Sequence, residues 1–453
     1  MKKSLLIKPF LTKSYPAASY GSGIYIYDTE GKRYIDGSSG AVTASIGHGI
    51  PDIIGKMEEQ SKKISFVYRS QFTNSPAELL AHKINEAVNS EENYWSFFVN
   101  SGSEATETAM KIAIQHFQEQ GLFQKNKIIS RWMSYHGITM GSLSLSGHKL
   151  RREKFVTLLE DGPNAEAPYC YRCSFHMEYP ECNMMCALDI ERAIKRAGNE
   201  NVAAFIAEPI IGAAGGVIVP PPGYYEQVQE ICKKNNVLFI ADEVMTGFGR
   251  TGKMFALEHW TSEADIIVTG KGLSAGYAPI GAALCKESVL HPVLNGSKSI
   301  MSGHTFSANP QSAAAALAVL DYMNKHQLIE KASLQGKYLF RKLKKLKQST
   351  PVIGEVRGKG LLAGIELVCN PVSKKPFPRK AAVTERVINK AQQKGLLIYP
   401  ATAGERGYEG DAVIIAPPLI VTRKEIDEMM TILQAVFQEL LQELCKEGHH
   451  FVS

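Results

Sequence analysis

The sequence predicts an α/β protein, with a large domain built on a mainly parallel sheet and a smaller α+β domain at the C-terminal end. Between Trp95 and Gly270, short apolar runs alternate with stretches of helical periodicity: WSFFV, KIISRW, AAFIAE, VLFIADE and DIIVTG. Runs of this length, separated by helices, are typical of parallel strands buried on both faces. After Ser312, helical stretches are followed by two more strand-like runs and a last amphipathic helix.

The length of the chain indicates more than one domain. At 453 residues the chain is too long for one ordinary core. We expect an N-terminal segment, residues 1–70, that joins the small domain, a large domain over 71–320 and a small C-terminal domain over 321–453. The N-terminal segment is predicted to carry a hairpin around Glu30 and Gly31, because apolar and polar residues alternate on both sides of this turn.

Composition and charge argue against nucleic-acid binding and membrane insertion. The chain has 51 basic and 45 acidic residues, a net charge of +6, without a long basic run. Lys8, Pro9 and Lys13 interrupt the first apolar residues before a signal-peptide core forms. The apolar stretches are shorter than the roughly 20 residues that span a bilayer. We therefore expect a cytoplasmic protein that binds neither nucleic acid nor membrane.

Four of the eight cysteines crowd into one segment. Cys170 and Cys173 have C-x-x-C spacing, whereas Cys182 and Cys186 have C-x-x-x-C spacing. A tetrahedral zinc site is one interpretation. The irregular second spacing and the many aromatic neighbours favour packing of reduced thiols instead, and a redox pair is a third alternative. We expect no metal here.

Two charged residues stand at the carboxyl ends of predicted strands. Asp242 ends the run VLFIAD, and Lys271 follows the run DIIVTG between Gly270 and Gly272. Ligands of α/β proteins bind at these strand ends, and glycines allow a ligand to approach the backbone closely. An Asp–Lys pair so placed fits pyridoxal phosphate (PLP), with a Schiff base on the lysine and the aspartate beside the ring nitrogen. A buried ion pair without chemistry fits the two residues equally well.

Two more strand ends carry polar or aromatic residues. Ser101, Gly102 and Ser103 separate a strand from a helix, and a helix N-terminus with small residues binds phosphate readily. The same residues also suit an ordinary N-cap. Tyr135 and His136 end a third strand segment, where an aromatic ring can stack on a flat heterocycle or simply bridge core and surface.

Six motifs follow one another along most of the chain, from about Gly23 to Leu433: SGSEAxE, YHG, AEPIIGAAGGVIVPPPGY, DEVMTGFGRTGK, TGKGLSAGYAPIGA and GHTFSANP. In this order they resemble the motifs of the class III (omega) PLP-dependent aminotransferases. The resemblance implies fold type I of the PLP-dependent transferases, with a seven-stranded sheet in the PLP-binding large domain. It also implies a homodimer with shared active sites, or a tetramer that contains two such dimers.

The resemblance implies a role for each matching residue. Lys271 and Asp242 are the expected catalytic residues, as the Schiff-base lysine that carries the proton and the partner of the ring nitrogen. Tyr135 and Val244 would contact opposite ring faces, and Thr305 would reach the phosphate of the neighbouring subunit. The expected cofactor-binding residues are Ser101, Gly102, Ser103, Tyr135, His136, Glu208, Asp242, Val244, Lys271 and Thr305.

Glu208 has two interpretations. In the family pattern an acidic residue at this position lies near the cofactor, where it pairs with an arginine or orients the region of the ring hydroxyl. A carboxylate in a purely structural ion pair is the alternative.

The substrate side is less well defined by the sequence. Members that accept amines commonly carry Leu-Trp after the DGxxG turn, whereas Ala41 and Val42 occur here, so this wall is less aromatic. A substrate carboxylate calls for a bidentate cation, and Arg406 in a glycine-containing loop is the best candidate, with a solvated loop arginine as the alternative. Tyr20 and Arg69 are further candidates.

These parts imply an aminotransferase. It would move an amino group from an amine or amino acid, of omega type, to a keto acid such as pyruvate or 2-oxoglutarate in a ping-pong cycle. An aminomutase or a decarboxylating transaminase would share Lys271 and Asp242, and a non-catalytic PLP-fold binder would share the fold. The intact lysine, aspartate and phosphate site favour the enzyme.

Overall fold

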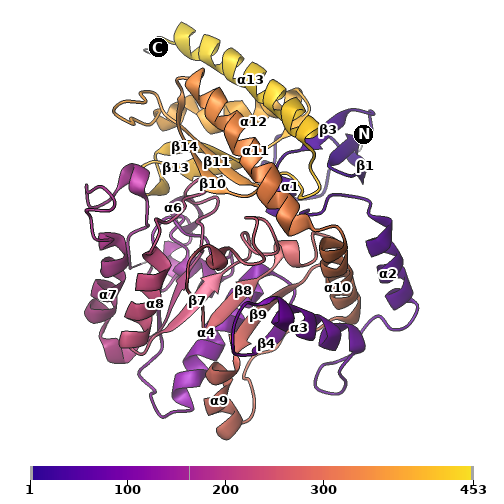
Figure 1. The fold of residues 1–453 in the computed structure, drawn as a ribbon, viewed down its shortest axis with the longest axis vertical. Helices are drawn as coiled ribbons and strands as arrows, with labels where there is room; N and C mark the ends of the chain where they lie inside the picture. Colours follow the sequence, from indigo (N-terminus) through magenta and orange to yellow (C-terminus); the bar gives the residue numbers. More distant parts are fainter. Residues whose placement is uncertain (1–3, 163, 450–453) are drawn as a thin grey trace.

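A six-stranded sheet forms the centre of the larger part of the molecule (Figure 1). The computed structural model describes residues 4–162 and 164–449, so residues 1–3 and 450–453 of the predicted end segments lie outside the described residues. The strands follow the order β4-β9-β8-β7-β6-β5 across the sheet. They are β4 (Tyr94–Val99), β5 (Lys127–Ile129), β6 (Val202–Ala207), β7 (Leu238–Asp242), β8 (Ile266–Thr269) and β9 (Gly281–Lys286).

The sheet is mainly parallel, as predicted, but it has one antiparallel member. Strands β5 to β8 pair in parallel, and β9 runs antiparallel to both β8 and β4. A parallel return requires a crossover connection, usually a helix. The short segment 270–280 between β8 and β9 holds only a single 3-10 turn, at Lys271–Leu273. The chain therefore comes back in the opposite direction.

The predicted count of seven strands is wrong for the part of the chain that the structure describes. Beyond β5 the pairing shrinks to isolated bridges, from Arg131 to Ala165 and from Trp132 to Gly147. The segment that would extend the sheet there leaves it after these single contacts, so the regular ladder ends at β5.

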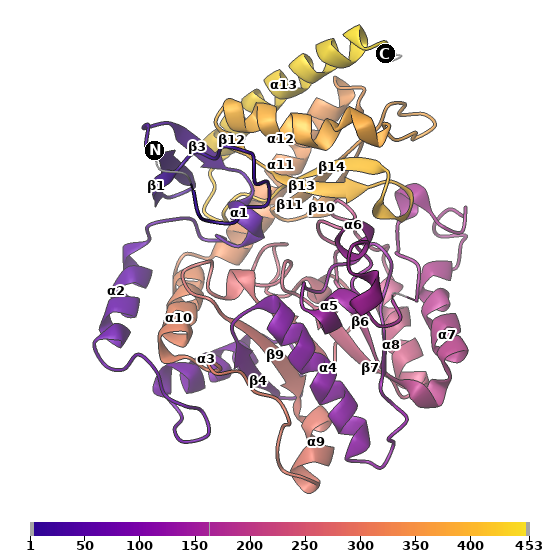
Figure 2. The same ribbon diagram turned by 180° about the vertical axis from the view of Figure 1, so that it is seen from behind.

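Helices cover both faces of this sheet. Helix α4 (Gly102–Gln118) crosses the face seen in Figure 2, and α8 (Tyr224–Lys234) lies beside β7 on the face seen in Figure 1. Every residue of β6, β8 and β9 is buried. This burial on both faces is the reason that these strands read as continuous apolar runs.

The C-terminal part builds a second, antiparallel sheet in the order β10-β11-β14-β13. Its strands are β10 (Ile353–Lys359), β11 (Leu362–Leu367), β13 (Tyr399–Ala403) and β14 (Gly410–Ile415). Three helices lie with it at one end of the molecule (Figure 1): α11 (Leu328–Gln348), α12 (Val383–Gln393) and α13 (Arg423–Lys446). Thr422 caps α13, and Glu425 completes the capping box.

The N-terminal strands join this C-terminal part. Strands β1 (Ala18–Ser22), β2 (Tyr25–Asp28) and β3 (Arg33–Asp36) form the predicted hairpin region. The short strand β12 (Leu396–Leu397) pairs in parallel with β3. This pairing supports the proposed assignment of residues 1–70 to the small domain, although the domain boundaries themselves stay predictions.

The remaining helices connect these sheets. They are α1 (Ser39–Val42), α2 (Pro51–Ser61), α3 (Ser75–Ala87), α5 (Met140–Leu145), α6 (Lys149–Arg152), α7 (Met185–Ala197), α9 (Glu287–Asn295) and α10 (Pro310–Lys325). Among the described helices, none is both long and apolar enough to cross a membrane.

The four clustered cysteines lie in the segment that leads into α7. All are free thiols, and Cys182 is buried. Burial raises the pKa of Cys186 to about 12, so this thiol is neutral, as a packing group is. Within residues 4–162 and 164–449, no group of three or more potential ligand side chains is arranged to hold a metal ion.

Candidate active site

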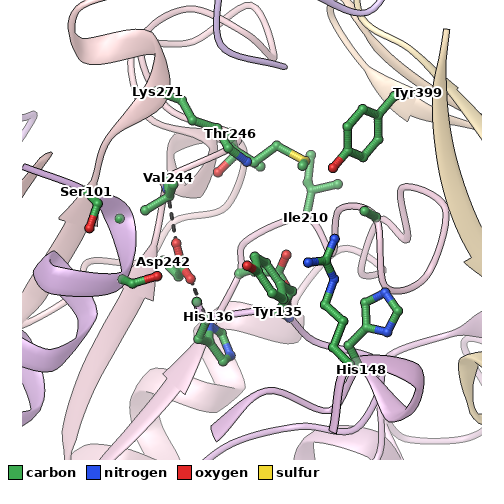
Figure 3. A pocket seen from close by; sticks show the side chains of 17 residues that line it. Ser101, Tyr135, His136, His148, Ile210, Asp242, Val244, Thr246, Lys271 and Tyr399 are labelled. Atoms are coloured by element: carbon green, nitrogen blue, oxygen red, sulfur yellow. Dashed lines mark hydrogen bonds and ion pairs between the residues drawn. The ribbon is translucent and has the colours of Figure 1, made fainter. Parts of the chain in front are cut away.

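A cavity of about 190 Å³ lies where the carboxyl ends of β6, β7 and β8 meet the N-terminus of α4 (Figure 3). Nine of the ten predicted cofactor-binding residues line it: Ser101, Gly102, Ser103, Tyr135, His136, Glu208, Asp242, Val244 and Lys271. The structure therefore brings together side chains that are up to 170 positions apart in the sequence (271 − 101 = 170).

Asp242 is fixed at the end of β7. Its Oδ2 lies 2.7 Å from Nδ1 of the buried His136, and its Oδ1 accepts a hydrogen bond from the Val244 N–H at 3.1 Å. Each oxygen has a second lone-pair direction that these contacts do not use. A carboxylate held in this way can accept a further hydrogen bond from a ligand in the cavity.

Lys271 follows β8 with a φ of +36°, a left-handed conformation that is rare for a side chain other than glycine. Residues held in such conformations cluster at functional sites. Burial lowers the pKa of Lys271, against the opposing effect of Asp242 and Glu208, and the positive charges of Arg151 and Arg250 lower it further. A lysine with a lowered pKa is a better nucleophile near neutral pH.

The N-terminus of α4 forms the opposite end of the cavity. Ser101 is its N-cap and accepts a hydrogen bond from the Glu104 N–H at 3.2 Å. The N–H groups of Gly102 and Ser103 have no intrahelical acceptor, so this 17-residue helix presents them to a ligand. The N-cap and the phosphate-site interpretations are thus compatible.

Close packing explains why position 102 is glycine. A Cβ there would lie 2.8 Å from Cγ1 of Val244. Gly270 faces the same point, because a Cβ built on it would lie 3.6 Å from the Gly102 backbone. The strand end, the helix N-terminus and Val244 therefore meet without room for another side chain.

Glu208 is buried at the end of β6 and makes no ion pair within the described residues. Its carboxylate accepts hydrogen bonds from the N–H groups of Tyr135 and Gly212, both at 3.0 Å. Arg131 donates instead to the main-chain oxygen of Glu208, at 2.6 Å. Burial raises the pKa of Glu208, and the nearby His136 lowers it. The arginine partner considered for Glu208 is thus not found, and the carboxylate positions the backbone of Tyr135.

Three predicted substrate residues lie outside this cavity. Tyr20 is exposed on β1 and stacks on Tyr27, with ring centroids 4.6 Å apart. Val42 is buried at the end of α1. Arg69 lies over the ring of Phe97, 4.7 Å from its centroid, and also donates to the Ser302 carbonyl. As substrate contacts these residues stay predictions.

Two further predictions concern loops. Thr305 is exposed and does not line the cavity of its own chain, as its predicted contact with a neighbouring subunit requires. The side chain of Arg406 lies outside the described part of the structure, so its predicted role is not tested.

Four polar side chains of the cavity were not predicted: His148, Arg151, Thr246 and Tyr399. Figure 3 shows His148 and Tyr399 across the cavity from Asp242 and Lys271. For His148 and Arg151 the only signal in the sequence is the basic run HKLRR, which begins shortly after the YHG motif. No strand end or glycine motif marks them.

Comparison with known proteins agrees with this site. Residues 13–437 match the family model described as aminotransferase class III. This chain belongs to the class III aminotransferases. It is 51% identical over 444 residues to an uncharacterized aminotransferase of Bacillus subtilis, YodT, and covers all of that relative with 98% of its own length.

Relatives with described substrates or ligands also resemble this aminotransferase. It is 34% identical to a putrescine–pyruvate aminotransferase of Pseudomonas aeruginosa, over 90% of this chain and 88% of the relative. The crystal structure of an amine transaminase from an uncultivated Pseudomonas species in its PLP-bound form superposes with a TM-score of 0.90, at 32% identity, over 96% of this chain and 99% of that one.

The enzyme is therefore PLP-dependent with fold type I, and its cavity fits the cofactor. The free N–H groups of α4 suit the phosphate, and the spare lone pairs of Asp242 suit a protonated ring nitrogen. Tyr135 and Val244 line the same cavity, where their side chains suit contact with the cofactor ring. The amine of Lys271 opens onto the same space. When bound, PLP supplies an electron sink for the carbon that loses a proton.

Proposed function

We propose that this aminotransferase moves an amino group from an amine or amino acid of omega type to a keto acid, such as pyruvate or 2-oxoglutarate, in a ping-pong cycle. The observation that carries the proposal is that Lys271 and Asp242 line one cavity together with the free N-terminus of α4. A relative named for putrescine and pyruvate supports an amine donor with pyruvate as acceptor.

Each residue then has a chemical task. Lys271 would hold the cofactor, and its lowered pKa favours the neutral amine, the form that can accept a proton from the substrate carbon. Asp242 stabilises positive charge at the ring nitrogen, and His136 keeps its carboxylate in place. Glu208 holds the backbone of Tyr135, whose ring borders the cavity. Because one cavity serves donor and acceptor, the two bind in turn.

We further propose that the enzyme acts in the cytoplasm as a homodimer, or as a tetramer that contains two such dimers. Exposed apolar side chains flank Thr305 in sequence, since Met301 is 78% and Phe306 is 56% exposed in the single chain. Burial of such groups against a second subunit would stabilise the pair. Light scattering after gel filtration at several concentrations measures the mass, and a monomer under all conditions would contradict this assembly.

Steady-state assays test the reaction itself. Purified enzyme with PLP receives putrescine or β-alanine as donor and pyruvate or 2-oxoglutarate as acceptor, and the amino product formed from the keto acid is measured by chromatography. We expect parallel lines in double-reciprocal plots. Isomerisation without a keto acid would indicate an aminomutase, CO₂ release a decarboxylating enzyme, and binding of PLP without turnover of any donor a binder.

A further inference from the structure

Arg151 stands at the cavity on a turn that its neighbour holds rigid. Nη1 of Arg152 donates to the carbonyls of Leu143, Ser144 and Ser146 at 2.8, 2.5 and 3.2 Å. These bonds tie helix α6 to the end of α5. The side chain of Arg151, by contrast, lines the cavity with Lys271. Of these two adjacent arginines, Arg152 therefore fixes the backbone, and Arg151 faces the cavity.

Arg151 has no counter-ion within residues 4–162 and 164–449, since no described carboxylate oxygen lies within 4.0 Å of its nitrogens. Its guanidinium carbon lies 4.7 Å from the centroid of the Tyr135 ring. Stacking on an aromatic ring uses the flat face of a guanidinium and leaves the N–H groups on its edge free. Those N–H groups match the two oxygens of a carboxylate.

A second, independent polar group lacks a partner on the same wall. His148 is only 9% exposed, and its Nδ1 is buried without a hydrogen bond. Burial and the charge of Arg151 lower the pKa of His148 to about 4, so the ring is neutral at pH 7. An unsatisfied buried polar atom is costly. A ligand that enters this wall would provide the missing partner.

Tyr399 lines the same wall of the cavity, but it comes from the C-terminal sheet. It comes from β13, lines the cavity and points its hydroxyl into it (Figure 3). Lys271 and Asp242 lie on the opposite side, so a substrate whose amino group reaches Lys271 directs its other end toward Tyr399 and Arg151.

We propose that Arg151 binds the carboxylate of the substrate, and that the enzyme therefore prefers amino acid donors and keto acid acceptors to simple amines. Tyr399 and His148 contribute further hydrogen bonds on this wall. This inference rests on the proposed aminotransferase activity and assigns the recognition of a carboxylate to α6.

Matched donor pairs test the proposal. β-Alanine is compared with propylamine, and 5-aminopentanoate with pentylamine, because each pair differs only in the carboxylate-bearing end. The rate of the visible spectral change of bound PLP is followed after donor is added without acceptor. In Arg151→Gln we expect the preference for the carboxylate-bearing donor to fall about 10- to 100-fold, the loss typical of a charged hydrogen-bonded contact. Arg151→Lys, which keeps the charge but not the fork, is expected to lie between.

The control is Lys149→Gln in the same helix. Lys149 lies over Tyr408, 4.2 Å from its ring centroid, and does not line the cavity. The substitution Lys149→Gln removes one positive charge from the same helix as Arg151→Gln does. A general electrostatic effect would therefore appear in both variants. We expect the donor preference of this variant to match that of the native enzyme.

A binding measurement separates this proposal from the activity it rests on. Propionate carries a carboxylate but no amino group, and its affinity is measured by titration against the absorbance of bound PLP. We expect a loss of at least about 10-fold in Arg151→Gln, with an unchanged affinity for PLP at the high pH where loading of PLP levels off. A loss of PLP affinity at that pH, or equal losses for both members of each donor pair, would overturn the proposal. If propionate binds through Arg151 but no donor reacts, the proposed transamination fails while the carboxylate site stands.

Discussion

The two walls of the cavity differ in how their polar groups are satisfied. On the wall with Asp242 and Glu208, each carboxylate accepts two hydrogen bonds or close polar contacts from the protein. On the wall with His148 and Arg151, one ring nitrogen is buried without a partner and the guanidinium has no counter-ion among the described residues. Both carboxylates of the first wall are held in place by the protein, whereas no described carboxylate pairs with the guanidinium of the second wall.

This difference fits two kinds of binding partner. A resident cofactor stays in place through every turnover, so its surroundings gain from being fixed in advance. The amino donor and the keto acid acceptor occupy the same space in turn. A wall with unpaired hydrogen-bonding groups can bind each of them through the carboxylate that they share. We therefore expect variants of the two walls to fail in different ways.

The largest effect is expected at Lys271. Lys271→Ala removes both the covalent attachment and the group that moves the proton, so kcat/KM is expected to fall by about 10⁴-fold or more. Transamination is measured with PLP in excess, and a thermal melt checks that the variant is folded. A variant that keeps more than about a tenth of native activity would place the proton transfer elsewhere.

A smaller effect is expected at the other catalytic position. Asp242→Asn keeps the shape of the side chain but removes its negative charge, so positive charge at the ring nitrogen loses its stabilisation, and kcat is expected to fall about 100- to 1000-fold. His136→Gln, which removes only the contact that positions Asp242, serves as a comparison with a smaller expected loss. Equal losses in both variants would show that position, rather than charge, dominates.

The phosphate end of the first wall is sensitive to volume. In Gly102→Ala the new Cβ would lie 2.8 Å from Val244, so the strand end must shift and PLP affinity is expected to fall about 10- to 100-fold. Gly55→Ala in α2 is the matched control, because a Cβ there meets nothing within 4 Å. Equilibrium dialysis of PLP measures both. Unchanged affinity in Gly102→Ala would show that the packing relaxes without cost.

The smallest expected effect concerns the pKa of Lys271, which depends on charged residues of both walls. Burial lowers the pKa of Lys271, and Arg151 and Arg250 lower it further, while Asp242 and Glu208 raise it. Because only the neutral amine captures PLP, loading of the apo-enzyme is expected to rise with pH and to level off below the pH at which an ordinary lysine is neutral. Arg151→Gln removes one lowering charge and is expected to move this profile to higher pH. A shift to lower pH would contradict the assigned proximity.

The sequence predicted the cavity residues at the strand ends, such as Asp242 and Lys271, and missed the polar residues of the opposite wall. Local patterns are enough to place Asp242 and Lys271. A buried apolar run indicates a strand, and the polar residue that ends the run indicates the edge of the sheet. His148 directly precedes the short helix α6, Arg151 belongs to it, and Tyr399 comes from the C-terminal sheet. Only tertiary packing brings His148, Arg151 and Tyr399 together. The periodicity of a single segment does not predict such packing.

The same limit applies to the sheet. The apolar runs of β4 to β8 were predicted because they are rich in β-branched and aromatic residues. Strand β9 reads GAALCK, whose small residues have little strand preference, so it was not predicted. The seventh strand was expected only from the family resemblance, and the chain between Arg131 and Ala165 forms two isolated bridges in its place.

The most direct test of the account is the absorbance spectrum of the purified native enzyme and of Lys271→Ala, each with PLP, before and after one addition of donor without acceptor. The native enzyme is expected to show the visible band of bound PLP, to lose it when donor is added and to regain it with pyruvate or 2-oxoglutarate. Lys271→Ala is expected to lack the native band and to show no such cycle. A native band that no donor changes, or a variant that cycles like the native enzyme, would contradict transamination through Lys271.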